Sequence, residues 1–145
     1  MDSGYRLQCS NCGTRIGVPH GETHVRRRCP GCGMLLIPGH ALPQEVTDDT
    51  WEAEVLGSAA PVVVEVWGPE CEVCAQYELA VRQMAVDLYG KARVLRLNIE
   101  ENPRTVARYE VQGVPTVLLF AEGRHVATLP GPRGVRGIRE RLGID

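Results

Sequence analysis

Apolar residues change their spacing several times along the second part of the chain, and each change predicts a new element. An almost unbroken apolar run at 62–67, which follows Pro61, is typical of a strand buried on both faces of a sheet. From Cys71 onward the apolar positions recur every three or four residues, so we expect a long helix that ends at Gly90. Apolar residues at 94–99 predict a second central strand. Together these segments predict a right-handed β-α-β unit.

The residues after this unit carry start and stop signals for smaller elements. Asn102 followed by Pro103 predicts a helix start, and Gly113 is expected just beyond the end of that helix. Three more elements are expected: strands at 116–120 and 125–129, joined by a hairpin turn at Glu122-Gly123, and a last short helix at about 133–142.

The N-terminal third has a different character. Residues 5–38 contain two cysteine pairs, many turn residues and little periodicity, and residues 39–46 are typical of a linker. A short helix is expected over about 48–56, because Thr47 can cap it and two aspartates follow in the first turn, where the helix dipole favours acidic side chains. We therefore expect a small module over 5–38 and an α/β domain over 47–145.

Composition favours a globular chain, and charge distinguishes its two parts. The chain has 145 residues, of which 43% are hydrophobic and 23% are charged, as in ordinary folded domains. A net charge of −2 and a pI near 6.1 argue against wholesale nucleic-acid binding. Residues 1–40 carry five arginines against two acidic residues, whereas the remainder has a charge balance of −5. This asymmetry fits two units of different character.

The sequence also bears on where the protein works. The N-terminus lacks the apolar segment of a secretory signal, and no apolar run approaches the roughly 20 residues needed to span a bilayer. We therefore expect a cytoplasmic protein without membrane contact, in a compartment that keeps thiols reduced. The six cysteines, all in C-x-x-C pairs, then point to metal or redox chemistry rather than to a disulfide framework.

Two of the cysteine pairs have the spacing of a metal site. Cys9-x-x-Cys12 and Cys29-x-x-Cys32 are separated by sixteen residues, which is typical of zinc bound by four cysteines. Each pair can place two thiolates on one side of a tetrahedral ion, and a glycine directly after each pair leaves the backbone free to turn. We therefore predict one Zn²⁺ per chain, bound by these four cysteines.

Other interpretations of this region stay open at the level of sequence. The four cysteines could form disulfides, which the expected compartment disfavours, or a further redox couple that releases zinc on oxidation. His20 and His24 are near enough to be ligands, although four available thiolates favour a solvated position for both. Arg26, Arg27 and Arg28 could contact nucleic acid, but three charges in a run are typical of a solvated face.

The third pair lies in a different context. Cys71-Glu72-Val73-Cys74 stands between the predicted strand at 62–67 and the first turn of the long helix. Free N–H groups and the helix dipole at that place stabilise a thiolate on Cys71, and Cys74 is placed to attack a mixed disulfide formed on Cys71. A C-x-x-C pair beside a β-α-β unit is typical of a thioredoxin-like redox motif.

Residues 61–131 resemble the body of thioredoxin. The motifs that carry the resemblance are PVVVEVWGPEC with the C-x-x-C pair, VLRLNIEENP, YEVQGVPTVLLF and a final Gly131. The N-terminal extension is similar to that of the zinc-containing bacterial thioredoxins often called thioredoxin 2. The resemblance implies an α/β thioredoxin fold, with a central mixed sheet flanked by helices, and a small N-terminal zinc ribbon.

The same resemblance implies an activity and partners. It implies reduction of disulfides in client proteins, followed by re-reduction of this chain by a thioredoxin reductase. Flavin and nicotinamide would be bound by that reductase and not directly by this chain. No nucleic acid and no membrane are expected as partners.

The resemblance also assigns roles to single residues. Cys71 corresponds to the nucleophilic cysteine and Cys74 to the resolving one. Glu65 stands where the family has a buried Asp implicated in proton transfer, although it could be an ordinary charge paired with Arg96, which stands at the position of a common Lys. Pro115 matches the cis-proline of the family. Four residues are assigned to substrate contact, and the aromatic one could equally be a packing residue: Trp67, Glu70, Val114 and Gly131.

Three departures from the family pattern bear on the chemistry. The usual C-G-P-C is C-E-V-C here, the usual Trp before the nucleophile is Glu70, and the buried Asp is Glu65. These changes leave the two-thiol mechanism available, while the redox potential and the choice of partner stay open. A rival hypothesis is therefore a zinc-ribbon adaptor or binding protein on a thioredoxin scaffold, with little turnover.

Overall fold

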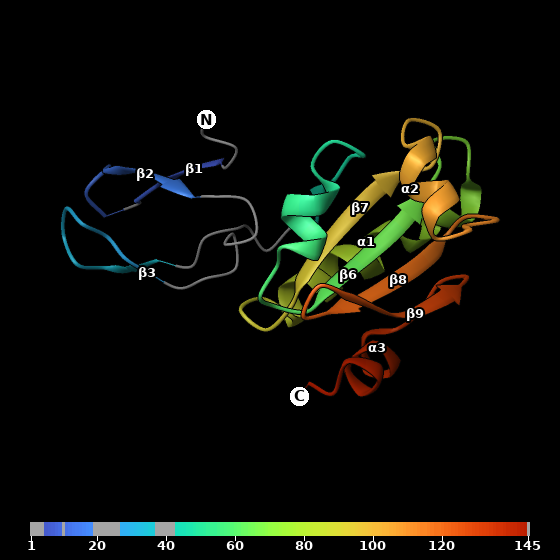
Figure 1. The fold of residues 1–145 in the computed structure, drawn as a ribbon. Helices are drawn as coiled ribbons and strands as arrows, with labels where there is room; N and C mark the ends of the chain where they lie inside the picture. The colour runs from blue at the N-terminus through green and yellow to red at the C-terminus, as the bar shows by residue number, and fades with distance from the viewer. Residues whose placement is uncertain (1–4, 10, 19–26, 37–42, 145) are drawn as a thin grey trace.

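The computed structural model describes residues 5–9, 11–18, 27–36 and 43–144 (Figure 1). His20, His24 and Arg26, considered above, lie outside these ranges. A five-stranded sheet forms the centre of the larger part, in the order β5-β7-β6-β8-β9. Its strands are β5 Gln44–Glu45, β6 Val62–Trp67, β7 Arg93–Asn98, β8 Thr116–Ala121 and β9 Arg124–Pro130. The helices beside it are η1 Glu52–Leu56, α1 Glu72–Asp87, α2 Pro103–Arg108 and α3 Val135–Leu142.

The sheet is mixed, as expected. β5, β7 and β6 run parallel to one another, whereas β8 is antiparallel to β6 and β9 is antiparallel to β8. β6 lies in the middle and its residues 62–66 are all buried, as the unbroken apolar run predicts. Helix α1 connects β6 to β7, so the β-α-β unit is confirmed. The turn between β8 and β9 has positive φ at Glu122 and Gly123, 53° and 74°, which suits the twist of a tight hairpin.

Helices cover both faces of the sheet (Figure 1). On one face α1 and α3 pack against it, and Tyr77 and Ile138 join Val63 in one buried cluster. On the other face η1 and α2 pack against it, and Trp51 and Val55 contact the alternate valines of β6. None of the helices in the described ranges combines the length and the apolar character that a membrane span requires.

The segment 48–56 differs from the expected α-helix. Residues 48–50 form a turn, in which the Thr47 hydroxyl accepts a hydrogen bond from the backbone N–H of Thr50 at 3.3 Å. Residues 52–56 form the π-helix η1. The backbone carbonyl of Glu54 accepts a hydrogen bond from the Arg93 guanidinium at 2.7 Å. Arg93 is the first residue of β7, far from Glu54 in the sequence, so the local sequence pattern does not reveal this contact.

Asp48 serves a different helix from the one that follows it in the chain. Its carboxylate accepts hydrogen bonds from the backbone N–H groups of Arg104 and Thr105, at 3.1 and 2.9 Å. These N–H groups belong to the first turn of α2, and Asn102 itself makes no side-chain cap there. The predicted start of α2 is therefore confirmed, but a residue from before η1 caps it.

Two boundaries also differ from the sequence prediction. Gln44–Glu45, at the end of the predicted linker 39–46, form β5, and the backbone N–H of Val46 continues the pairing to the Arg96 carbonyl at 2.8 Å. A two-residue strand is too short to produce a hydrophobic period. Helix α2 ends at Arg108, and Glu110 rather than Gly113 adopts positive φ, 53°, after it.

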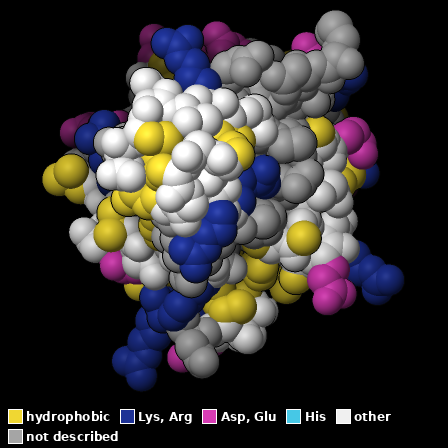
Figure 2. All heavy atoms as spheres, turned by 90° about the vertical axis from the view of Figure 1, so that its left-hand side faces the viewer, with side chains coloured by type: hydrophobic (Ala, Val, Ile, Leu, Met, Phe, Trp, Pro, Cys, Tyr) yellow, Lys and Arg dark blue, Asp and Glu magenta, His cyan; other side chains and the backbone are white. Residues whose placement is uncertain are grey.

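The N-terminal part contains two antiparallel hairpins. The first pairs β1 Tyr5–Gln8 with β2 Arg15–Val18, and the second pairs β3 Arg27–Arg28 with β4 Leu35–Leu36. Each hairpin carries one C-x-x-C pair in its connection. Figure 2 views the molecule from this side: Lys and Arg side chains are prominent on the face, whereas Asp and Glu side chains lie toward its rim.

Candidate functional site

The third cysteine pair follows the carboxyl end of β6. Cys71 is half-buried and is the N-cap of α1, whereas Cys74, one turn further along, is buried. The two side chains form a disulfide, with their Cα atoms 5.2 Å apart. The backbone N–H of Cys74 donates a hydrogen bond to the Cys71 sulfur at 3.0 Å. This N–H has no partner within the helix, so the Cys71 sulfur lies where a helix start favours a thiolate.

An open hollow of about 250 Å³ adjoins this disulfide. Both cysteines line it, together with Trp67 from the end of β6, Arg96 from β7 and Glu78 from α1. The Arg96 guanidinium lies over the Trp67 ring, with its central carbon 4.5 Å from the ring centroid. The structure therefore brings two of the predicted residues, Trp67 and Arg96, beside the dithiol.

Glu65 and Arg96 form the expected pair inside the sheet. They are direct neighbours in the pairing of β6 with β7, and the Arg96 Nε donates to Glu65 Oε1 at 2.9 Å. Glu65 is 1% exposed, and its Oε2 has no hydrogen-bond partner within the described ranges. Burial raises the pKa of Glu65 above its ordinary value, although the hydrogen bond from Arg96 opposes this change. The carboxyl group is therefore poised to hold a proton more firmly than an exposed one.

A second hollow, of about 450 Å³, is lined by two more of the predicted contact residues and by Pro115. Val114, Pro115 and Gly131 line it, the Val114–Pro115 bond is cis as expected, and the Gly131 N–H donates to the Pro115 carbonyl at 2.8 Å. A Cβ atom placed on Gly68 would lie 3.4 Å from a Val114 methyl and 3.8 Å from the Cys71 Cβ. These are ordinary van der Waals distances, so the Val114 loop and the dithiol loop are direct neighbours at Gly68.

Acidic and apolar side chains flank the nucleophile position. Glu70 and Glu72 are exposed on either side of Cys71, and Val73 is 47% exposed. Within the described residues neither glutamate forms an ion pair, and neither lines one of the two hollows. Glu70, predicted as a substrate contact, thus stands on the open surface beside the disulfide.

Two acidic residues near Arg96 were missed by the sequence analysis. Glu45 Oε2 lies 3.8 Å from Arg96 Nη1, and Glu78 Oε1 lies 4.0 Å from the same nitrogen. Glu45 also accepts a hydrogen bond from the Trp67 indole at 3.3 Å. The only available signal was the i,i+4 spacing of Cys74 and Glu78, which places Glu78 near the dithiol on α1.

The four N-terminal cysteines lie together. Their sulfur atoms are all within 4.8 Å of one another, and the sulfur atoms of Cys9 and Cys32 are 3.7 Å apart, those of Cys12 and Cys29 3.6 Å apart. Ligands about 2.3 Å from a tetrahedral zinc ion lie about 3.8 Å from one another. The donor set and its spacing therefore fit one Zn²⁺.

Both N-terminal pairs use the same backbone turn. The Cys9 carbonyl accepts a hydrogen bond from Gly13 at 2.9 Å and the Cys29 carbonyl one from Gly33 at 2.8 Å, and these glycines have φ values of 79° and 81°. Burial raises the pKa of the Cys29 thiol, but backbone hydrogen bonds within its turn lower it, and the net value is about 6. A lowered pKa favours the thiolate, which is the form that binds a metal.

Comparison with known proteins agrees with this geometry. The thioredoxin family model matches residues 43–143. The thioredoxin of Rickettsia bellii is 37% identical over 90 residues, which are 62% of this chain and 86% of its own. The thioredoxin of Acidithiobacillus ferridurans is 38% identical over 86 residues, 59% of this chain and 80% of its own. A chloroplastic M-type thioredoxin of Pisum sativum is 33% identical over 107 residues, 68% of this chain and 62% of its own.

The family match has a clear limit. It includes the sheet, the helices and the Cys71–Cys74 disulfide, and it leaves the four N-terminal cysteines outside. The redox site and the candidate metal site therefore rest on different observations, the first on geometry and similarity and the second on geometry alone. The geometry of the redox site and the similarity to known thioredoxins together show that the chain belongs to the thioredoxin family of thiol–disulfide oxidoreductases.

Proposed function

We propose that this chain reduces disulfide bonds in client proteins through Cys71 and Cys74. The Cys71 thiolate attacks one sulfur of the client disulfide, forming a mixed disulfide and releasing the other client sulfur as a thiolate. Cys74 then loses its proton and attacks the Cys71 sulfur. The mixed disulfide breaks, the second client thiol leaves, and the chain is left with the Cys71–Cys74 disulfide.

The observation that carries this proposal is the unequal setting of the two cysteines. Cys71 is half-buried and its sulfur accepts a hydrogen bond at the start of α1, whereas Cys74 is buried and is bonded to Cys71. A nucleophile needs access and a stabilised thiolate, and a resolving thiol needs proximity to the mixed disulfide.

The surrounding residues support separate steps of this reaction. We assign Glu65 the role of accepting the proton that Cys74 loses. Arg96 orients the Glu65 carboxyl group through the hydrogen bond from its Nε to Glu65 Oε1 at 2.9 Å. A carboxyl group whose pKa is raised by burial is better matched to a thiol than an exposed one. We assign contact with the client protein to Val114, Pro115 and Gly131, which line the second hollow, and to Trp67, which lines the first. Glu70, exposed beside the disulfide, is assigned to the same contact surface.

We further propose that the N-terminal hairpins form a zinc ribbon. Cys9, Cys12, Cys29 and Cys32 would hold one Zn²⁺, either as a structural ion or as one that leaves on oxidation. In this proposal the module spans 5–38 and the thioredoxin domain 47–145, and the chain resembles the zinc-containing bacterial thioredoxins. A cytoplasmic location and a flavin- and NADPH-dependent reductase as electron donor belong to the same proposal.

The alternative is a binding protein with little turnover. The exposed Glu70, Glu72 and Val73 around Cys71 favour it, because an unusual surface at this point suits recognition of a particular partner. Turnover of a model disulfide such as insulin, measured with NADPH and a thioredoxin reductase, distinguishes the two functions. The oxidoreductase should consume NADPH catalytically, and an adaptor should not.

Variants of the two cysteines test the order of attack. Cys74→Ser should accumulate mixed disulfides with client proteins, since the resolving thiol is missing, and these should appear on non-reducing gels and disappear with dithiothreitol. Cys71→Ser is the matched control and should trap none. Trapping by Cys71→Ser alone would reverse the two assignments.

A further inference from the structure

Glu45, Arg96 and Glu65 are lateral neighbours on three adjacent parallel strands. The pairing of β5 with β7 places Glu45 opposite Arg96, and the pairing of β6 with β7 places Glu65 opposite the same Arg96. The side chains follow this register, because Arg96 Nε lies 2.9 Å from Glu65 Oε1 and Nη1 lies 3.8 Å from Glu45 Oε2. One guanidinium group thus lies between a buried carboxyl group and a half-exposed one.

Glu45 restrains a second residue of the redox site. Its Oε1 accepts the hydrogen bond from the Trp67 indole at 3.3 Å, while its Oε2 faces Arg96. The Trp67 ring in turn lies against the Arg96 guanidinium, 4.5 Å from its central carbon. Both Trp67 and Arg96 line the hollow beside the disulfide. The Glu45 carboxylate on β5 therefore contacts two of the residues that line that hollow.

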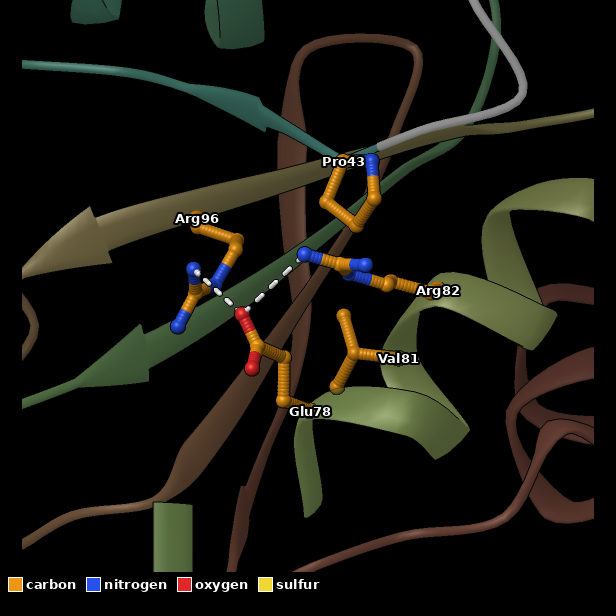
Figure 3. Close-up of a pocket in the computed structure, with 5 residues that line it drawn as sticks. All are labelled: Pro43, Glu78, Val81, Arg82 and Arg96. Carbon is orange, nitrogen blue, oxygen red and sulfur yellow. Dashed lines mark ion pairs between the residues drawn. The ribbon is translucent and has the colours of Figure 1, made fainter. Parts of the chain in front are cut away.

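A third carboxylate approaches Arg96 from α1. Figure 3 shows Glu78 between Arg96 and Arg82, with Pro43 opposite it. Glu78 Oε1 lies 4.0 Å from Arg96 Nη1 and 3.6 Å from Arg82 Nη2, and these residues line a small cavity of about 120 Å³. Glu78 divides its charge between two arginines and has no contact with Trp67 among the interactions described. Its influence on Arg96 should therefore be weaker than that of Glu45.

From this arrangement we propose that Glu45 is a positioning residue for the reaction at Cys71 and Cys74, which fixes Arg96 and Trp67 beside the dithiol and shares the Arg96 charge with Glu65. The inference deepens the proposed function, in which Glu65 takes the proton of Cys74. In its ionised form Glu45 draws part of the Arg96 attraction away from Glu65 and repels a second negative charge. Burial raises the pKa of Glu45 itself, while the contacts with Trp67 and Arg96 oppose this change and the charge of Glu101 adds to it. Glu65 then keeps its proton to higher pH than it would beside an unshared Arg96.

The groups that face Glu65 agree with this direction. From β7 Arg96 lowers its pKa, and from β5 and α1 the charges of Glu45 and Glu78 raise it, in addition to the effect of burial. Burial raises the pKa of Tyr77 from α1, and the nearby charge of Glu65 adds to this rise. On β8 the neighbour is the uncharged Val117. Glu45 is thus one of two anionic groups that oppose Arg96.

The test is a titration of the Glu65 carboxyl group by carbon-13 NMR in the oxidised full chain, which needs no turnover. Glu45→Gln removes the charge but keeps an oxygen that can accept the Trp67 hydrogen bond. It should move the Glu65 midpoint to lower pH by about half a unit, as expected for one charge acting across the shared guanidinium group in a partly solvated site. Glu45→Ala should give the same shift and also change the Trp67 indole N–H resonance. Glu52→Gln, which removes an exposed glutamate paired with Arg108 at 3.0 Å, is the matched control.

Each outcome bears on the inference. If Glu45→Gln moves the Glu65 midpoint no further than Glu52→Gln does, Glu45 does not share the Arg96 charge and the inference is wrong. If the Trp67 resonance is the same in Glu45→Ala as in the wild type, Glu45 does not position Trp67. The pH profile of resolution by Cys74 should shift with the titration. If the titration shifts and that profile does not, Glu45 keeps its positioning role and the proton transfer assigned to Glu65 is wrong.

Discussion

Replacement of Glu65 by leucine should stabilise the folded protein. Glu65 is 1% exposed, and its Oε2 has no hydrogen-bond partner in the described part of the chain. An unsatisfied buried polar atom costs about 1–3 kcal/mol, and a buried leucine contributes about 1.5–3 kcal/mol. The loss of the charge-assisted bond to Arg96 opposes this by about 1.5–3 kcal/mol. Arg96 is 18% exposed and keeps Glu45 and Glu78 as ionic neighbours, so its charge is not left buried without a partner. We therefore expect Glu65→Leu to raise the free energy of unfolding by about 1–3 kcal/mol at neutral pH.

This stabilisation should increase with pH. Burial raises the folded-state pKa of Glu65 above the ordinary value of 4.5, despite the hydrogen bond from Arg96. A raised folded-state pKa means that proton binding stabilises the wild type below the unfolded-state pKa, and this contribution is lost as the pH rises through the folded-state pKa. The leucine variant has no carboxyl group to ionise. Its advantage should therefore grow between those two pKa values, by at most about 1.4 kcal/mol per pH unit.

Urea unfolding of oxidised wild type and variant, at several pH values from about 4 to about 8, measures the effect. Glu65→Gln is the matched control, because it removes the charge but retains a polar group. It should show the same pH trend with a smaller gain. A leucine variant less stable than the wild type at neutral pH, or a stability difference that is constant with pH, would refute the reasoning.

Two further predictions concern the metal site and the acidic flanks. Cys29→Ser should lose stoichiometric zinc, measured by metal analysis of protein purified under reducing conditions, while circular dichroism shows the α/β domain still folded; wild type without zinc would contradict the metal site. Glu70→Gln/Glu72→Gln should shift the pH profile of Cys71 alkylation to lower pH, because negative charge beside a thiolate disfavours it. Salt should reduce that shift, since both side chains are exposed. An unchanged profile in the double variant would show that these two charges do not influence the ionisation of Cys71.

The elements that the sequence predicted well are those with a local signal of sufficient length. The apolar run 62–67 and the three-and-four spacing after Cys71 each extend over a whole element, and the structure has β6 and α1 at these places. The helix start at Cys71 then follows from the change of period alone. The two glycines after the N-terminal pairs were likewise read correctly, because positive φ at Gly13 and Gly33 is a local requirement.

The features that the sequence analysis missed depend on contacts between distant segments. Asp48 was expected to favour its own helix, but it caps α2, since the fold brings that helix start beside it. Glu54 lies in a π-helix and bonds to Arg93 from the β-α-β unit. Glu45 fell within the predicted linker because a two-residue strand has no period, and its pairing with β7 is what carries it to Arg96. Strand register is a tertiary property, and no pattern within residues 39–46 encodes it.

The arginine at position 96 connects Glu65, Glu45 and Trp67. A lysine has a compact charge at the end of a flexible chain, whereas arginine has a planar group with donors on several sides. Here Nε binds Glu65, Nη1 faces Glu45 and Glu78, and the flat surface lies on Trp67. A single ammonium group cannot occupy all these places at once. The glutamate at 65, the arginine at 96 and the glutamate on β5 therefore act as one coupled arrangement, in which a change at one position alters the charge available to the other two.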